Sequence, residues 1–261
     1  MAEFNHMYQR ATYYDIVFKR DVSRELDFVS DLYYQRQGRS PCSLVDLACG
    51  PGYHARAFAK RGGTAYGLDL RAEMTAFADE QARAEGVQVH WLAADMRHFR
   101  LEEPVDLIIN MFDGIDCLNS NEDLLAHFNA VAHNLTPGGL YLLDVTHPAQ
   151  VGYGYYGSFA YSGERDGVSV EIKWATNKPY VHARTGVAET EIEMHIDDHG
   201  QKHIIRDCAH ERIITAPEIE LFCWLSDGLR ILDFYGDFDL NQPLDNSPTS
   251  RRMIGVLQKF G

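Results

Sequence analysis

The sequence predicts an α/β protein built on a doubly wound, mostly parallel sheet. Between residues 44 and 143, five short apolar segments alternate with stretches of helical period. Strands that are separated by helices pair in parallel, with helices on both faces of the sheet. A glycine turn follows the first strand directly, at the sheet edge where open α/β folds bind ligands. After residue 153 the apolar period becomes two, which predicts an antiparallel insertion.

Two helices are expected before the sheet, between residues 8 and 38. In the second, Val22, Leu26, Val29 and Tyr33 lie on one helical face, and Gly38 ends it. The strands of the sheet are expected at 44–47, 64–68, 87–93, 105–109 and 140–143, and the intervening helices at 53–60, 71–85 and 120–135, with a turn at 136–139.

The insertion is expected between residues 153 and 214. Val168, Val170, Ile172 and Trp174 alternate with polar residues, and residues 197–200 form a hairpin turn. A capping box at 215–218 then opens a helix that ends near residue 228. Strands at 230–235 and 253–259 complete the sheet. The single domain thus divides into residues 1–40, the core 41–147, the insertion 148–214 and the closing part 215–261.

Composition narrows the classes of partner. The 261 residues carry a formal net charge of −14 without a basic run, which disfavours nucleic acid as a partner. The five cysteines are irregularly spaced, which is typical of a reducing compartment rather than a disulfide framework. No apolar run has membrane-spanning length. We therefore expect a cytoplasmic protein with no membrane partner and a small-molecule substrate.

Three carboxylates indicate the ligand of the glycine turn. Gly50 and Gly52 fit a dinucleotide fingerprint, but Asp46 precedes them on the strand, where a pyrophosphate would meet its charge. A carboxylate there suits an ammonium group. Asp69 ends the next strand, where an acid accepts ribose hydroxyls, and Asp95 ends the third, in place for an adenine amino group. A ligand with an amino-acid end, a ribose and an adenine is S-adenosylmethionine.

Four motifs in order resemble those of class I S-adenosylmethionine-dependent methyltransferases. They are VDLACGPG at 45–52, YGLD at 66–69, ADM at 94–96 and NLTPGG at 134–139. The resemblance implies a seven-stranded Rossmann-like sheet whose last strand is antiparallel, a helical lid over residues 1–40 and a roof over 148–214. Residues 13–15 and 235–239 resemble, more loosely, bacterial methyltransferases of amino sugars and other secondary metabolites.

The same resemblance assigns the cofactor site. S-adenosylmethionine, and S-adenosylhomocysteine as product, would be held by Asp46, Ala48, Gly50, Gly52, Asp69, Leu70, Ala94, Asp95, Met96, Asn110 and Phe112. Phe112 would lie near the reacting methyl group. The loop after the fourth strand, residues 110–113, lacks the Asn/Asp-Pro-Pro-Tyr motif of many base and glutamine methyltransferases. Such acceptors are therefore disfavoured.

Candidate catalytic residues depend on the acceptor. A neutral amine needs little beyond positioning, whereas a hydroxyl needs a base near the methyl group. His147, Tyr14 and Asp113 lie at the expected rim, and His147, just past the fifth strand, is the best placed. His195 and His203 flank the hairpin turn and are candidates for a pair that faces across it. Without acids on the same face, no metal site is expected.

The sequence thus predicts methyl transfer to a nitrogen or oxygen atom of a small metabolite, by a transferase whose roof offers a homodimer surface. One alternative keeps the cofactor but catalyses a cyclisation or decarboxylation. Another is a non-catalytic scaffold that binds the cofactor product. A nicotinamide oxidoreductase comes last.

Overall fold

A seven-stranded sheet forms the centre of the computed structural model, which describes residues 7–150 and 156–260. Its strand order is β10-β11-β5-β4-β1-β2-β3. Only β11 runs antiparallel to its neighbours, β5 and β10. The strands are β1 (Ser43–Leu47), β2 (Thr64–Asp69), β3 (His90–Ala93), β4 (Val105–Asn110), β5 (Leu135–Thr146), β10 (Leu229–Tyr235) and β11 (Arg252–Lys259). The predicted fold class is confirmed, including the antiparallel last strand.

The helices cover both faces of this sheet. Along β4, Ile108 packs into one apolar core with α5 and α6, whereas Leu107 and Ile109 pack into the other with α2 and α3. This alternation explains the continuous apolar run of β4, because both faces of the strand are buried. The helices are α2 (Ser23–Gln37), α3 (Tyr53–Lys60), α4 (Ala72–Ala84), α5 (Asn121–Asn134) and α6 (Ala216–Leu225). The capping box predicted at Thr215 and Glu218 opens α6.

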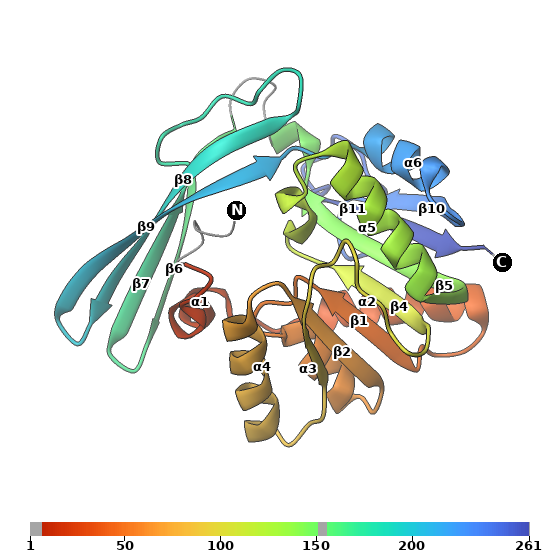
Figure 1. The fold of residues 1–261 in the computed structure, drawn as a ribbon, viewed down its shortest axis with the longest axis horizontal. Coiled ribbons are helices and arrows are strands. Elements are labelled where there is room, and N and C mark those ends of the chain that lie inside the picture. Colours follow the sequence, from red (N-terminus) through yellow and green to blue (C-terminus); the bar gives the residue numbers. More distant parts are fainter. Residues whose placement is uncertain (1–6, 151–155, 261) are drawn as a thin grey trace.

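The inserted segment forms a separate four-stranded antiparallel sheet, in the order β6-β7-β8-β9. It stands beside the central sheet, with α1 (Ala11–Phe18) against it (Figure 1). Its strands are β6 (Phe159–Arg165), β7 (Val168–Trp174), β8 (Val187–Asp198) and β9 (Gln201–Arg212). The pairs Val170–Ile196, Ile172–Met194 and Trp174–Ile192 are buried, as the period of two predicts.

Three details differ from the sequence-based expectation. The strand expected from residue 87 begins only at His90, because the Val87 amide closes the end of α4 by donating to the Ala82 carbonyl. The turn expected at 136–139 lies inside β5, as an irregularity between the pairs Val105–Leu135 and Leu107–Leu140. Of the helical lid expected over residues 1–40, α1 faces the second sheet, whereas α2 packs into the central core.

Two short 3₁₀ turns lie at the carboxyl edge of the central sheet. The turn η1 (Gly114–Cys117) follows β4, and η2 (Pro148–Gln150) follows β5. In the part of the chain that the structure describes, no helix is both long and apolar enough to cross a membrane.

Candidate active site

The glycine loop between β1 and α3 has left-handed backbone at three positions, Ala48, Gly50 and Gly52. The two glycines serve different purposes. A Cβ on Gly52 would lie 2.3 Å from the Trp91 ring, so this glycine is required by the protein's own packing. A Cβ on Gly50 would meet nothing within 4 Å. Gly50 therefore leaves open space beside the loop, on the side where a ligand can approach the backbone.

Asp46 lies at the end of β1 and is only 2% exposed. Its Oδ2 atom accepts no hydrogen bond from the described residues. Burial raises the pKa of this carboxyl to about 7, against a hydrogen bond from the Ala55 backbone. The nearest ring nitrogen, Nδ1 of His54, is 3.9 Å away, but burial lowers the His54 pKa to about 3. His54 is therefore neutral and supplies no counter-charge, which leaves Asp46 suited to a cationic ligand group.

Asp69 ends β2 and binds the glycine loop. Its Oδ2 accepts from the Gly50 amide at 2.8 Å, and its Oδ1 accepts from the Arg71 amide at 2.9 Å. Burial raises the pKa of Asp69 in spite of these two bonds. The next side chain, Leu70, is 64% exposed. An uncovered apolar side chain beside a carboxylate at a strand end suits the sugar and the base of a nucleoside.

At the end of β3, the carboxylate of Asp95 is held by a cation of this chain. Arg97 Nε lies 3.0 Å from both carboxylate oxygens, and these hydrogen bonds lower the Asp95 pKa. Ala94 donates its amide to the Asp69 carbonyl, which keeps the two strand ends together. The structure thus places Asp95 beside Ala94 and Met96 as expected, but already engaged by Arg97.

Asn110 ends β4 and is fully buried. Its Nδ2 donates to the Leu47 carbonyl at 3.2 Å, and its Oδ1 has no partner among the described residues. Met96 lies against it, with the sulfur 3.7 Å from the same Nδ2. A second unpartnered oxygen therefore lies close to the end of β1.

Phe112 and Asp113 follow β4 in left-handed conformation and are held by an ion cluster. The Phe112 amide donates to Oδ2 of Asp144 at 3.0 Å, and Arg252 binds Asp144 at 2.6 Å and Asp113 at 3.1 Å. The guanidinium also lies 5.9 Å from the centroid of the Phe112 ring. Asp113, expected as a catalytic residue, is thus the ion-pair partner of Arg252. Burial raises the pKa of Asp144, against the charge of Arg252.

Tyr14 belongs to an aromatic group between α1 and the four-stranded sheet. Its ring centroid lies 4.4 Å from that of Phe18, and Phe18 lies 5.6 Å from Phe112 and 5.2 Å from Tyr161. Burial raises the pKa of Tyr14, and the charge of Asp69 adds to this effect. The Tyr14 phenol is therefore protonated in the ligand-free protein, and the charge of the Asp69 carboxylate acts on it.

His147, predicted as a candidate catalytic residue, lies just past β5 with its ring engaged by backbone groups. Its ring is buried, its Nε2 donates to the Asp245 carbonyl at 2.8 Å, and its Nδ1 accepts from the Ala149 amide at 3.0 Å. Both ring nitrogens are occupied by backbone groups. His147 therefore fastens the loop after β10 to the end of β5, and no nitrogen is free to take a substrate proton.

His195 and His203 do not face each other across the hairpin. In the β8–β9 register His195 opposes Ile204, and His203 opposes Ile196. Neighbouring positions point to opposite faces of a sheet, so the two rings lie on different sides. His195 instead binds Glu193 at 2.8 Å. Among residues 7–150 and 156–260, no group of three or more His, Cys, Asp or Glu side chains is arranged to hold a metal ion.

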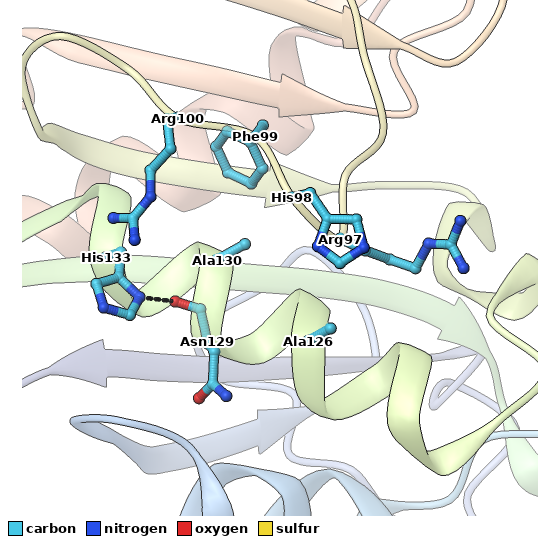
Figure 2. A pocket seen from close by; sticks show the side chains of 8 residues that line it. All are labelled: Arg97, His98, Phe99, Arg100, Ala126, Asn129, Ala130 and His133. Atoms are coloured by element: carbon cyan, nitrogen blue, oxygen red, sulfur yellow. Dashed lines mark hydrogen bonds between the residues drawn. The ribbon is translucent and has the colours of Figure 1, made fainter.

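A surface pocket of about 300 Å³ lies between the β3–β4 connection and α5 (Figure 2). It is lined by Arg97, His98, Phe99, Arg100, Ala126, Asn129, Ala130 and His133. Figure 2 shows His133 turned back onto its own helix, with Nδ1 bonded to the Asn129 carbonyl. Neither the glycine loop nor Asp69 lines this pocket.

The residues around the glycine loop fit S-adenosylmethionine. Two buried oxygens, Asp46 Oδ2 and Asn110 Oδ1, flank the end of β1 and have no hydrogen-bond partner in the part of the chain that the structure describes. Gly50 leaves the loop backbone approachable. Asp69 and the uncovered Leu70 stand at the next strand end. Such a set suits the ammonium, ribose and base of the cofactor, which supplies an electrophilic methyl group when bound.

The sequence did not predict the contacts between charged residues that are far apart along the chain. Arg252 and Asp144 form the ion cluster under Phe112, and Asp15 joins three elements. Asp15 accepts from the Tyr53 hydroxyl at 2.8 Å and from Arg165 at 2.7 Å. The only signal for these groups was the presence of charged residues in otherwise apolar surroundings, such as Asp144 at the end of β5.

Comparison with known proteins agrees with this geometry. Residues 44–139 match the family of methyltransferase domains. A curated relative from Streptomyces venezuelae, dTDP-3-amino-3,4,6-trideoxy-alpha-D-glucopyranose N,N-dimethyltransferase, is 31% identical over 147 residues, which cover 55% of this chain and 58% of that protein. The chain therefore matches little more than half the length of this relative.

Solved structures share the fold over nearly the whole chain. An S-adenosylmethionine-dependent methyltransferase from Clostridium acetobutylicum has a TM-score of 0.77 at 19% identity, covering 98% of this chain and 97% of that one. CalS10 from Micromonospora echinaspora, an amino pentose methyltransferase with the cofactor bound, has a TM-score of 0.68 at 21% identity and covers 92% of each chain. Residues 44–139 thus match the methyltransferase-domain family in sequence, and the chain shares its fold with these solved methyltransferase structures.

Proposed function

We propose that this chain is an enzyme that transfers a methyl group from S-adenosylmethionine to an amine nitrogen of a small metabolite, an amino sugar in particular. The observation that carries the proposal is the carboxyl edge of β1 and β2. There Asp46 has a buried oxygen without a hydrogen-bond partner among the described residues, and Asp69 holds the open glycine loop. The relative from Streptomyces venezuelae acts, by its name, on an amino sugar nitrogen.

Each part of the site has a distinct task in this proposal. Asp46 would receive the cofactor's ammonium group, and Asp69 its ribose hydroxyls. Asp95, Leu70 and Met96 would surround the base. Phe112, fixed by Arg252 and Asp144, would lie beside the reacting methyl group. Displacement at a sulfonium releases a neutral thioether, so holding the two reactants in line supplies much of the acceleration.

Nitrogen is favoured over oxygen as the acceptor atom. A hydroxyl acceptor needs a base at the methyl group, and the histidine best placed by sequence, His147, has both ring nitrogens engaged. An amine attacks through its own lone pair once it is neutral.

The test is incubation of the protein with S-adenosylmethionine and a dTDP-linked 3-amino sugar. We expect S-adenosylhomocysteine and a methylated sugar by mass spectrometry, with no product from the 3-hydroxy sugar. Cofactor consumption with cyclised or decarboxylated product would support the alternative reaction, and binding without turnover the scaffold. A thermal shift with NAD(P) but none with S-adenosylmethionine would contradict the proposal altogether.

We also infer a cytoplasmic location, supported by five cysteines that are all free thiols. A homodimer through the four-stranded sheet stays part of the proposal, and light scattering in solution tests it. Neither nucleic acid nor a membrane is proposed as a partner, in keeping with the net charge of −14.

A further inference from the structure

The buried face of the four-stranded sheet is open at its edge strand, β6. Across β6 and β7, Phe159 pairs with Trp174, and Tyr161 pairs with Ile172. Directly paired side chains lie on the same face of a sheet. Trp174 and Ile172 are buried, whereas Phe159 is 42% exposed and Tyr161 is 40% exposed. The face that is buried on β7 therefore ends, on β6, in two aromatic rings that are only partly covered.

The position of α1 explains this difference in cover. Gly163 lies on the same face of β6, and a Cβ there would be 2.2 Å from the Ile16 carbonyl, so the helix touches the strand backbone at this point. The helix packs against both β6 and β7 (Figure 1). Towards the start of β6 the cover is lost, and Tyr161 and Phe159 are exposed. Aromatic side chains that are held in place but partly open are typical of small-molecule sites.

The two exposed rings are held in fixed positions. The Phe159 ring lies nearly parallel to that of Trp174, with an interplanar angle of 10° and centroids 5.9 Å apart. Nε1 of Trp174 donates to Oε1 of Glu211 at 2.8 Å, which fixes the indole. The Tyr161 ring meets the Phe159 ring edge-on, with centroids 5.7 Å apart. Such a preordered surface loses little conformational entropy when a ligand binds.

This aromatic surface is continuous with the proposed site of methyl transfer. The centroid of the Tyr161 ring lies 6.1 Å from that of Phe112 and 5.2 Å from that of Phe18. Phe112 is itself held in place by its amide, which donates to Asp144 at 3.0 Å. Ring contacts thus lead from Phe112, through Tyr161, to Phe159 at the open edge of the sheet.

We propose that Phe159 and Tyr161 are specificity-determining residues, on which a planar unsaturated ring of the acceptor stacks while its amine lies at Phe112. This inference rests on the proposed function, which places the methyl group beside Phe112. The acceptor then carries its amine and its planar ring at opposite ends. The ring is either the base of a nucleotide-linked sugar or an aromatic group attached directly to the sugar. Both present the same flat π surface, which stacks favourably on aromatic side chains.

The experiment compares Phe159→Leu and Tyr161→Leu with Tyr180→Leu, a control at an 82% exposed tyrosine between β7 and β8. Leucine keeps apolar bulk but has no π face. The acceptors are three forms of one 3-amino sugar: the dTDP-linked sugar, its phenyl glycoside and its methyl glycoside, which has no planar ring.

Calorimetry in the presence of S-adenosylhomocysteine measures acceptor affinity without turnover. We expect Phe159→Leu and Tyr161→Leu to bind at least one ring-bearing acceptor about tenfold more weakly than the wild type does. The acceptor that shows this loss identifies the source of the ring. Affinity for the methyl glycoside, affinity for S-adenosylhomocysteine and the melting temperature should stay close to the wild-type values. In turnover, the loss should appear in KM rather than in kcat.

Three results would overturn the inference. One is equal affinity of the wild type and both variants for the two ring-bearing acceptors, and another is an equal loss for the methyl glycoside. The third is a dimer, seen by light scattering, that dissociates in Phe159→Leu while acceptor affinities are unchanged, which would assign the rings to an interface between copies. Wild-type protein that binds the cofactor but methylates none of the three amines would contradict the proposed function, whereas the affinity comparison decides the role of Phe159 and Tyr161.

Discussion

Asp46 and Asp144 invite comparison, because they occupy matching places in two halves of one sheet. Both end parallel strands, β1 and β5, and both are 2% exposed. Asp144 binds Arg252 and the Phe112 amide, so its carboxylate is paired and hydrogen-bonded within this chain. Asp46 has an oxygen with no partner among the described residues and a neutral histidine beside it.

The difference separates a structural carboxylate from one that awaits a ligand. A buried charge is expensive unless it is paired and hydrogen-bonded. Asp144, in the β5 half of the sheet, is both paired with Arg252 and hydrogen-bonded by the Phe112 amide, and this fixes Phe112. Asp46, in the β1 half, has no such pairing among the described residues, and it lies where the motifs predict the cofactor. The predictions below test this contrast, beginning with the largest expected effect.

Removing the cation of the β5 half should destabilise the fold strongly. Arg252→Met leaves Asp113 and Asp144 without their shared partner, and breaking a buried pair in this way costs about 3–5 kcal/mol. Urea unfolding measures the loss, with Arg251→Met, whose side chain is exposed, as the matched control. A loss no larger than that of the control would mean that the cluster contributes no stability.

Removing a carboxylate of the other half should abolish cofactor binding with a smaller effect on the fold. Asp69→Ala deletes the ribose acceptor and the anchor of the Gly50 amide. We expect affinity for S-adenosylhomocysteine to fall at least about 100-fold, or ~2.7 kcal/mol. Calorimetry measures it, beside the exposed control Asp31→Ala. Unchanged affinity of Asp69→Ala would refute the assignment.

Binding of the cofactor should release protons from Asp46. Its pKa of about 7 means that the ligand-free carboxyl is partly protonated at neutral pH, and an ammonium neighbour lowers that pKa. We expect roughly half a proton per ligand at pH 7, measured by calorimetry in buffers of different ionisation enthalpy. Asp46→Asn should show none of it, and an undiminished release from that variant would place the proton elsewhere.

The same group should govern the pH dependence of ligand-free stability. The folded pKa of about 7 is higher than that of an unfolded aspartate, about 4. The contribution is therefore fully present below about pH 4 and is lost as pH rises towards and through 7. Thermal melts should show a stability that declines over this range in the wild type and declines less in Asp46→Asn. Identical profiles would contradict the buried, unpaired state of Asp46.

The smallest effect is expected at Asp15, which has two partners. Tyr53→Phe removes one hydrogen bond to this buried carboxylate and leaves Arg165 in place. We expect a loss of about 1–2 kcal/mol, with Tyr180→Phe, an 82% exposed tyrosine, as the control. A loss as small as that of the control would show that Arg165 alone satisfies Asp15.

Periodicity and turn residues predicted most of the fold because they report local structure. The apolar run of β4, the alternation in β7 and β8 and the capping box of Thr215 each depend on a few neighbouring residues. The carboxylates Asp46 and Asp69 could also be predicted from the sequence, because each lies at a strand end. The irregularity in β5 was missed because Pro137 and two glycines also favour a turn.

Contacts between segments far apart in the sequence could not be predicted from periodicity and turn residues. The contact of His147 could not be predicted from the sequence, because its partner, the Asp245 carbonyl, lies nearly one hundred residues away. The ion pairs of Arg252 could not be predicted either, since nothing local shows whether a charged residue will be buried or which charge it will meet. Asp95 was placed correctly along the chain, but its pairing with Arg97 depends on side-chain conformation.

The bonds of α1 have a mechanical consequence. A Cβ on Gly163 would lie 2.2 Å from the Ile16 carbonyl, so α1 and β6 touch backbone to backbone. Arg165 donates a hydrogen bond to Asp15, and the Tyr13 hydroxyl donates one to Asp198. Helix and four-stranded sheet are thereby coupled as one rigid body. A movement of the four-stranded sheet away from the central sheet would therefore carry α1 with it and would break the Tyr53–Asp15 hydrogen bond.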